Sequence, residues 1–224
     1  SGDANARIVE QINQGVIGNL REVHNWSGRP MWPQYQELPT DRPPVPEGFD
    51  WQLWLGPERD RPYHPNYTHT VFRGWYDFGG GPMADMGIYS LWPVFTELGL
   101  GVPKSAQAWA THTCSIVDCV SRPAKNDFSY PTGCAIRIEF PARENVPAVD
   151  LFWYDGGMKP RLPRELESQG AEIQQEGILF VGDEGTILAK FGGGNPELFA
   201  KGRRESLAVD EASHRHAKTV SSLR

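Results

Sequence analysis

The stretch GGGPMADMGIYSLWP, which runs from Gly79 to Pro93, joins a glycine-rich turn to the start of an apolar helical pattern. Pro82 suits the first turn of a helix, because the amide donor that it lacks is not needed there. The spacing of apolar residues predicts a helix over Pro82–Leu98. Its apolar face is expected to hold Ile88, Leu91, Phe95 and Leu98.

A polar pair lies on a neighbouring face of this helix. Asp85 and Tyr89 are four residues apart, so their side chains are neighbours, and Trp92 follows on the same side. A carboxylate can orient a phenol, and a positioned phenol can transfer a proton to or from a reacting oxygen. The alternative from spacing alone is that Asp85 stabilises the helix N-terminus and that Tyr89 is a core aromatic.

The rest of the chain predicts helices first and strands later. A helix is expected from Asp3 to Gly15. The segments SAQAWATH, GCAIRIEFPA and PAVDLFWYDGG show strand patterns, and GILFVGDEGTILAKF indicates a hairpin that turns at Gly182–Gly185. This order favours an α+β fold, with an open, mostly antiparallel sheet. Between Arg29 and Pro65, frequent prolines predict a long ordered loop.

Composition excludes several classes of protein. The chain has 224 residues and a net charge of −6, so it lacks the basic surface of a nucleic-acid-binding protein. It contains no apolar run long enough to span a membrane. The three cysteines are not at zinc spacing, and we expect no metal site. The 8 tryptophans are compatible with a flat, partly apolar ligand such as a sugar, and equally with core packing.

Several segments together resemble the C-terminal domain of the glucose–fructose oxidoreductase/inositol dehydrogenase (Gfo/Idh/MocA) family. In chain order they are INQGVIGNLREVH, WQLWLGPERDRPYHPNY, FRGWYDFGGGPMADMGIY, LGLGVPKSAQA and FVGDEGTIL. The family pattern is G-G-x-x-x-D-x-G-x-H, and this chain has Asp85 and Gly87 in it but Tyr89 in place of the histidine. A further acidic residue that the family often has three positions later is Trp92 here.

The resemblance implies a dihydrodipicolinate reductase-like domain with its helices on one face of the sheet. It implies that Tyr89 is the acid/base for a sugar or polyol hydroxyl, oriented by Asp85, and that Gly80 and Gly81 let the backbone approach cofactor and substrate. The residues that we expect to contact substrate are Arg29, Trp32, Arg73, Trp75, Trp153 and Lys159. The alternatives are that each tryptophan anchors a loop or strand and that each arginine forms a surface ion pair.

The family's glycine-rich nucleotide-binding domain has no counterpart in this sequence. We therefore expect residues 1–224 to be one substrate and oligomerisation domain of a longer oxidoreductase. NAD or NADP is expected in the full-length protein and not on this chain alone. The open sheet face, with AIRIEF and VDLFWY, is expected to form a homo-oligomer. The chain does not begin with Met, so we expect a trimmed start; a cytoplasmic location is favoured and a periplasmic one stays open.

Two other functions stay open at this point. One is an NAD-dependent glycosidase or lyase on the same scaffold, which would turn over without net formation of NADH. The other is a separate carbohydrate-binding or protein-interaction module. A glycine fingerprint in the gene upstream of Ser1 would favour an oxidoreductase over such a module.

Overall fold

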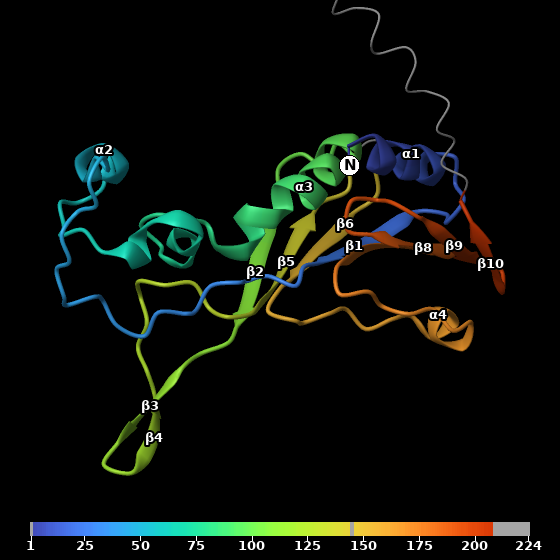
Figure 1. Ribbon diagram of the computed structural model, residues 1–224. Coiled ribbons are helices and arrows are strands. Elements are labelled where there is room, and N and C mark those ends of the chain that lie inside the picture. The colour runs from blue at the N-terminus through green and yellow to red at the C-terminus, as the bar shows by residue number, and fades with distance from the viewer. Residues whose placement is uncertain (1, 144–145, 208–224) are drawn as a thin grey trace, which may run out of the picture.

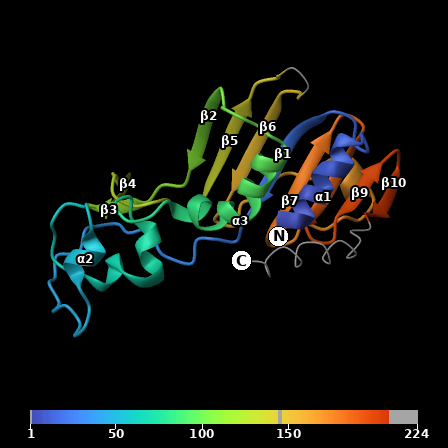
Figure 2. The ribbon, with the colours of Figure 1, turned by 90° about the horizontal axis from the view of Figure 1, so that it is seen from above.

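A computed structural model describes residues 2–143 and 146–207. An eight-stranded sheet runs through the molecule in the order β10-β9-β8-β7-β1-β6-β5-β2 (Figures 1 and 2). Its strands are β1 (Leu20–Trp26), β2 (Ser105–Ala110), β5 (Cys134–Phe140), β6 (Val149–Tyr154), β7 (Gly177–Gly182), β8 (Gly185–Lys190), β9 (Glu197–Ala200) and β10 (Arg203–Ser206). The strand pairs are antiparallel except for β1 and β6, which are parallel. The predicted α+β class and mostly antiparallel sheet are confirmed.

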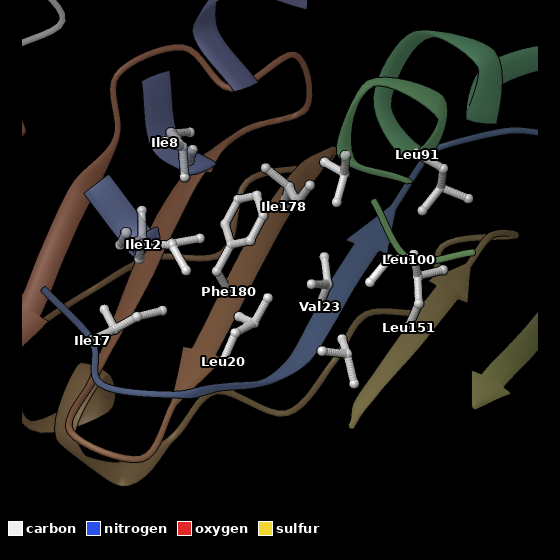
Figure 3. Close-up of a cluster of buried hydrophobic side chains, with 14 of the residues drawn as sticks. Ile8, Ile12, Ile17, Leu20, Val23, Leu91, Leu100, Leu151, Ile178 and Phe180 are labelled. Carbon is white, nitrogen blue, oxygen red and sulfur yellow. The ribbon is translucent and has the colours of Figure 1, made fainter. Parts of the chain in front are cut away.

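Two helices lie over one face of this sheet: α1 (Gly2–Asn13) and α3 (Gly81–Glu97) (Figure 2). The main core fills the space between them and the strands, as Ile8, Val23 and Phe180 illustrate in Figure 3. Along β5, Phe140 belongs to this core, and Cys134, Ile136 and Ile138 pack against it. Apolar burial on this scale supplies most of the stability of such a domain.

The short helix α4 (Arg164–Ser168) is an exception to the expectation that helices cover one face only. Figure 1 shows it on the side of the sheet opposite α1 and α3. Its Leu166 is fully buried in a second core with Trp26, Leu179, Leu188 and Phe199. The opposite face is therefore covered by α4 near β7–β9, and Tyr154 at the end of β6 packs against the same core.

The predicted helix at the glycine-rich stretch is confirmed as α3, but its core-facing side differs from the prediction. Ile88 is exposed, while Leu91 and Val94 are buried in the main core. The helix is fixed by a buried hydrogen bond in which Ser90 Oγ donates to Asn25 Oδ1 of β1 at 2.7 Å. Ile88 lies at the exposed edge of the helix, beside β5 and β6, rather than in the core.

The proline-rich segment is a long ordered loop, as predicted. It contains α2 (Trp51–Leu55) and is followed by the 3₁₀ helices η1 (Pro65–Tyr67) and η2 (His69–Gly74). These elements share a small aromatic core made of Trp51, Leu55, Tyr63, Tyr67 and Trp75. A separate hairpin of β3 (Cys114–Val117) and β4 (Val120–Pro123) projects from the body (Figure 1). Among the described residues, no helix is long and apolar enough to cross a bilayer.

Candidate active site

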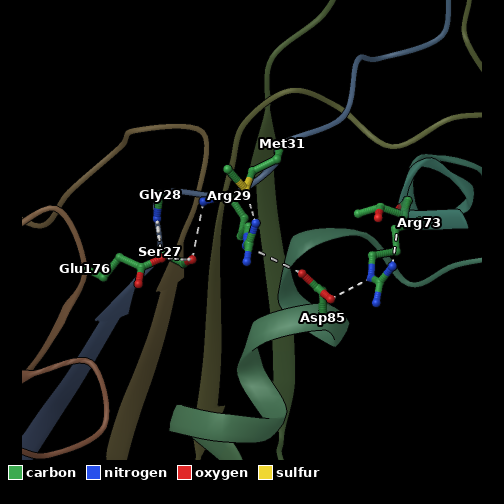
Figure 4. A network of polar contacts seen from close by, with 8 residues as sticks. Ser27, Gly28, Arg29, Met31, Arg73, Asp85 and Glu176 are labelled. Atoms are coloured by element: carbon green, nitrogen blue, oxygen red, sulfur yellow. Dashed lines mark hydrogen bonds and ion pairs between the residues drawn. The ribbon is translucent and has the colours of Figure 1, made fainter.

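The candidate site is built around Asp85, near the start of α3. Arg73 Nε donates to Asp85 Oδ1 at 2.6 Å, and Arg29 Nε lies 3.7 Å from Asp85 Oδ2. Figure 4 shows the two guanidinium groups approaching the carboxylate from different elements. The structure thus brings together three residues that the sequence proposed separately.

Arg29 is held in place by the segment that leaves β1. Ser27 Oγ donates to Glu176 Oε1 at 2.8 Å, and the Gly28 amide donates to the same oxygen at 3.1 Å (Figure 4). The Gly156 amide donates to the Arg29 carbonyl at 2.6 Å. Sequence reasoning missed Glu176, because nothing local marks a side chain that bonds to a segment so distant in the chain.

Arg73 belongs to η2, and the turn after it is shaped by glycines. A Cβ on Gly79 would lie 2.5 Å from the Arg73 Cα, and a Cβ on Gly80 would lie 2.4 Å from the Ala84 Cβ. Gly81 has a φ of 64° and packs against the ring of Tyr130. These glycines therefore serve the packing of the chain on itself. The prediction that Gly80 and Gly81 approach a cofactor remains a prediction.

Tyr89 stands one turn after Asp85 and is 58% exposed. Its hydroxyl forms no hydrogen bond with any residue that the structure describes, and the partners of the Asp85 carboxylate are the two arginines. The expectation that Asp85 holds Tyr89 directly is therefore wrong in this structure. A short aspartate side chain is drawn to two nearby cations rather than to a neutral phenol one turn away.

An apolar groove of about 500 Å³ adjoins this part of α3. It runs between the helix and strands β5 and β6, and Ile88 and Trp92 line it together with Phe95 and Ile138. Ile88, Tyr89 and Trp92 are all more than half exposed. The helix thus presents an uncovered, largely apolar side with one hydroxyl on it.

The other predicted substrate contacts lie elsewhere. Trp75 is buried in the small aromatic core, where its indole N–H donates to the Asn66 carbonyl at 2.7 Å. Trp153 is fully buried in the main core, and its indole donates to Asp155 Oδ2 at 2.8 Å. Both expectations of substrate contact are corrected, because neither ring has surface left for a ligand. Their indoles satisfy local acceptors and pack, which was the alternative for each tryptophan.

The two remaining predicted substrate contacts are Trp32 and Lys159. Trp32 is buried, and its indole nitrogen has no hydrogen-bond partner in the described part of the chain. Lys159 is exposed in the loop after β6. Both stay predictions. Within residues 2–143 and 146–207, no group of three or more His, Cys, Asp or Glu side chains is placed to hold a metal ion.

A second polar cluster surrounds a buried carboxylate at the end of β6. Asp155 accepts hydrogen bonds from the Cys134 amide at 2.7 Å, from the Cys134 thiol and from Trp153. Burial raises the pKa of Asp155, and these donors partly oppose the rise. Burial and the neighbouring carboxylate also raise the pKa of the Cys134 thiol, so this cysteine is a poor nucleophile.

Comparison with protein-family models identifies the family of this chain. The family model described as the oxidoreductase family C-terminal alpha/beta domain, of the Gfo/Idh/MocA proteins, matches residues 13–185. No curated protein matches the chain.

Solved structures similar to this one come from several organisms. An NAD binding oxidoreductase from Klebsiella pneumoniae is 14% identical, with a TM-score of 0.45, and the match covers 92% of this chain and 45% of that one. Aldose–aldose oxidoreductase from Caulobacter crescentus, complexed with glycerol, is 13% identical, with a TM-score of 0.42 and coverage of 91% and 44%. The super-repressor mutant of Gal80p from Saccharomyces cerevisiae is 12% identical, with a TM-score of 0.45 and coverage of 92% and 44%. The chain thus spans less than half the length of each.

Proposed function

Because the chain belongs to the C-terminal domain family of the Gfo/Idh/MocA oxidoreductases, we propose that it is the substrate-binding half of an NAD(P)-dependent oxidoreductase that acts on a sugar, polyol or related hydroxyl compound. The observation that carries the proposal is the position of Tyr89. Its hydroxyl is exposed on α3, one turn from the charged cluster of Asp85, Arg29 and Arg73.

Tyr89 is the proposed acid/base. When substrate is oxidised, the phenolate form of Tyr89 accepts the proton of the reacting hydroxyl and becomes a phenol; in the reverse direction the phenol donates that proton and becomes a phenolate. A phenol O–H is a hydrogen-bond donor, which suits an oxygen that gains negative charge. The bound nicotinamide would supply the hydride chemistry, and the protein would orient the reactants.

The exposed side of α3, which carries Ile88, Tyr89 and Trp92, is suited to contact the nicotinamide ring of such a cofactor. Ile88 and Trp92 flank Tyr89 and border the apolar groove, so a flat ring could lie against them without burying a charge. The phosphates of the dinucleotide need a glycine-rich turn at a helix N-terminus of a βαβ unit, which we place in a domain outside this chain. The chain alone is then expected to bind NADH only weakly. Micromolar affinity in a titration would contradict the proposal that another domain binds the dinucleotide phosphates.

The open side of β5 and β6 is the proposed homo-oligomer surface. It carries the ion pair of Arg137 and Asp150, whose N–O distance is 2.6 Å, beside the stacked rings of His24 and Phe152. Paired charges and aromatic rings are compatible with a protein–protein interface. Sedimentation of the chain at high concentration tests this, and a strict monomer would contradict it.

The direct test of the proposed reaction uses the full-length protein. It is incubated with NAD or NADP and a panel of sugars and polyols deuterated at the carbinol carbon. We expect deuterium to appear on the nicotinamide ring with at least one substrate. No transfer across the panel would contradict the oxidoreductase assignment. Release of an elimination product without net NADH would instead support the glycosidase or lyase alternative.

A further inference from the structure

The cluster at the start of α3 carries more positive than negative charge. Arg29 and Arg73 share the single carboxylate of Asp85, which leaves one positive charge in excess. The side chain of Asp85 is 15% exposed, whereas those of Arg29 and Arg73 are 29% and 32% exposed. The carboxylate is therefore the inner member of the cluster, and the guanidinium groups are its accessible members.

Both guanidinium groups contact Asp85 through Nε and not through the paired terminal nitrogens. Arg29 Nη1 contacts the sulfur of Met31, and Arg73 Nη1 lies 3.4 Å from the Thr70 carbonyl oxygen (Figure 4). In the described part of the chain, the Nη2 atom of each arginine has no hydrogen-bond partner. Since a guanidinium has five N–H donors in a rigid plane, each arginine keeps directed donors for another acceptor.

We propose that the substrate carries a carboxylate, which the Nη2 groups of Arg29 and Arg73 bind while its reacting hydroxyl lies toward Tyr89. This inference rests on the proposed function, and it narrows the substrate class to sugar acids such as uronic or aldonic acids. Tyr89 follows Asp85 by one helical turn, a rise of about 6 Å along the axis. In this proposal a single hexose unit places its carboxylate at the arginines and a ring hydroxyl at the tyrosine.

The charge balance favours a carboxylate over a phosphate. One carboxylate neutralises the single excess charge, whereas a phosphate monoester carries about −1.5 to −2 near neutral pH. Asp85 already lies among the arginines, so a second negative charge on the ligand would be repelled without a cation to match it. A planar carboxylate also suits guanidinium donors, which bind it in fixed geometry.

The opposing view is that the arginines serve only to fix the loop and η2 against α3. The two views differ in what they predict for ligand binding. A purely structural cluster gives no preference between a neutral sugar and its acid. A cluster that binds substrate gives tighter binding of the sugar acid than of the neutral sugar. This preference depends on both arginines and weakens as the salt concentration rises, because partly exposed charges are screened.

The test is calorimetric titration of the full-length protein, with saturating NADH present and then absent. The ligands are D-glucose, D-glucuronate and D-glucose 6-phosphate, with the matched galactose series as a second set. We expect at least one acid to bind about tenfold more tightly than its neutral sugar, which is the size of one charge-assisted contact. Raising NaCl from about 50 mM to about 500 mM should weaken binding of the acid and leave that of the neutral sugar unchanged.

Single substitutions test whether the preference for the sugar acid depends on Arg29 and Arg73. Arg29→Gln and Arg73→Gln should each reduce the acid preference to less than about threefold. Arg21→Gln is the matched control, because Arg21 forms a comparable ion pair with Asp183 at 2.9 Å on another part of the molecule. It should keep the full preference. The comparison of ligands on the unmodified protein needs no variant, so a variant that fails to fold does not weaken the test.

Equal binding of acid and neutral sugar, tighter binding of the phosphate, or no binding of either acid would overturn the inference. A clear acid preference without deuterium transfer to the nicotinamide would contradict the proposed function and leave the carboxylate site standing. Oxidation of neutral sugars with no preference for the acid would support the proposed function and contradict the carboxylate site.

Discussion

Asp85 and Arg73 form a 2.6 Å ion pair that joins the first turns of α3 to the 3₁₀ helix before the glycine-rich turn. This pair, extended by Arg29, replaces the expected contact between Asp85 and Tyr89. It gives the aspartate a role in holding the arginines together and leaves the tyrosine hydroxyl free for a ligand.

Removing the charge of Asp85 should destabilise the domain. Asp85→Asn keeps the shape of the side chain but leaves two guanidinium groups close together without a carboxylate. We expect a loss of about 1–2 kcal/mol in the free energy of unfolding, because the pair is partly exposed and screened. Urea denaturation measures it. Asp127→Asn is the control, since the ion pair of Asp127 with Lys125 lies on the open surface. Asp127→Asn should leave the free energy of unfolding unchanged. An equal loss in both variants would contradict the role given to Asp85.

The three thiols should react at two different rates. Cys114 and Cys119 are exposed on the projecting hairpin, whereas Cys134 is partly buried and its pKa is raised by burial and by Asp155. Because the thiolate is the reactive form, a disulfide reagent at mildly alkaline pH should modify the first two quickly and Cys134 slowly. The released chromophore counts them over time. Fast reaction of all three in the folded chain would contradict this burial of Cys134.

The second core depends on one side chain of α4. Leu166→Ala should lower the free energy of unfolding by about 2–4 kcal/mol, as expected for a cavity at a fully buried leucine. Leu53→Ala is the matched control, because Leu53 of α2 is exposed and its truncation opens no cavity. Thermal or urea unfolding compares the two variants. Similar small effects would mean that α4 does not pack on the sheet as described.

The open sheet face should carry a pH-dependent contribution to stability. A hydrogen bond from His24 lowers the pKa of Glu22 from its ordinary value of 4.5, and nearby Arg137 adds to this, while burial opposes it. A carboxylate with a lowered pKa stabilises the fold above its unfolded pKa, and that contribution is lost as pH falls through the folded value. The stability advantage of the unmodified chain over Glu22→Gln should therefore be present at pH above about 5 and shrink toward pH 3. Glu184→Gln, in an exposed turn, is the control variant for this comparison.

The sequence predicted those parts of the fold that carry a local pattern. The helix predicted over Pro82–Leu98 and the hairpin of β7 and β8 each have clear periodicity and turn residues. The strands β3, β4, β9 and β10 were not predicted. Each has only four residues, and β10, RRES, has no apolar alternation to reveal it. The parallel pairing of β1 with β6 is a long-range contact that no local pattern encodes.

The site was predicted only in part, because its contacts join residues that are distant in the sequence. Residue type marked Arg29 and Arg73 as candidates, but only the folded chain shows that both reach Asp85. Trp75 and Trp153 were misassigned, because a tryptophan in a core and a tryptophan in a binding site look alike in sequence. Ile88 was misplaced because helical spacing alone does not tell which of several apolar residues, such as Leu91 and Val94, face the core.

The central claim is that Tyr89 transfers the proton of the substrate hydroxyl, and Tyr89→Phe in the full-length protein tests it most directly. The substitution removes only the hydroxyl from an exposed ring, so folding and thermal stability should be unchanged. The matched control is Tyr76→Phe, because Tyr76 is also exposed and lies outside α3. With the substrate found by the deuterium assay, we predict that kcat/KM falls by about 10²–10⁴-fold in Tyr89→Phe, the usual contribution of a positioned proton-transfer group, and stays unchanged in the control. Near-normal turnover of Tyr89→Phe would contradict the claim.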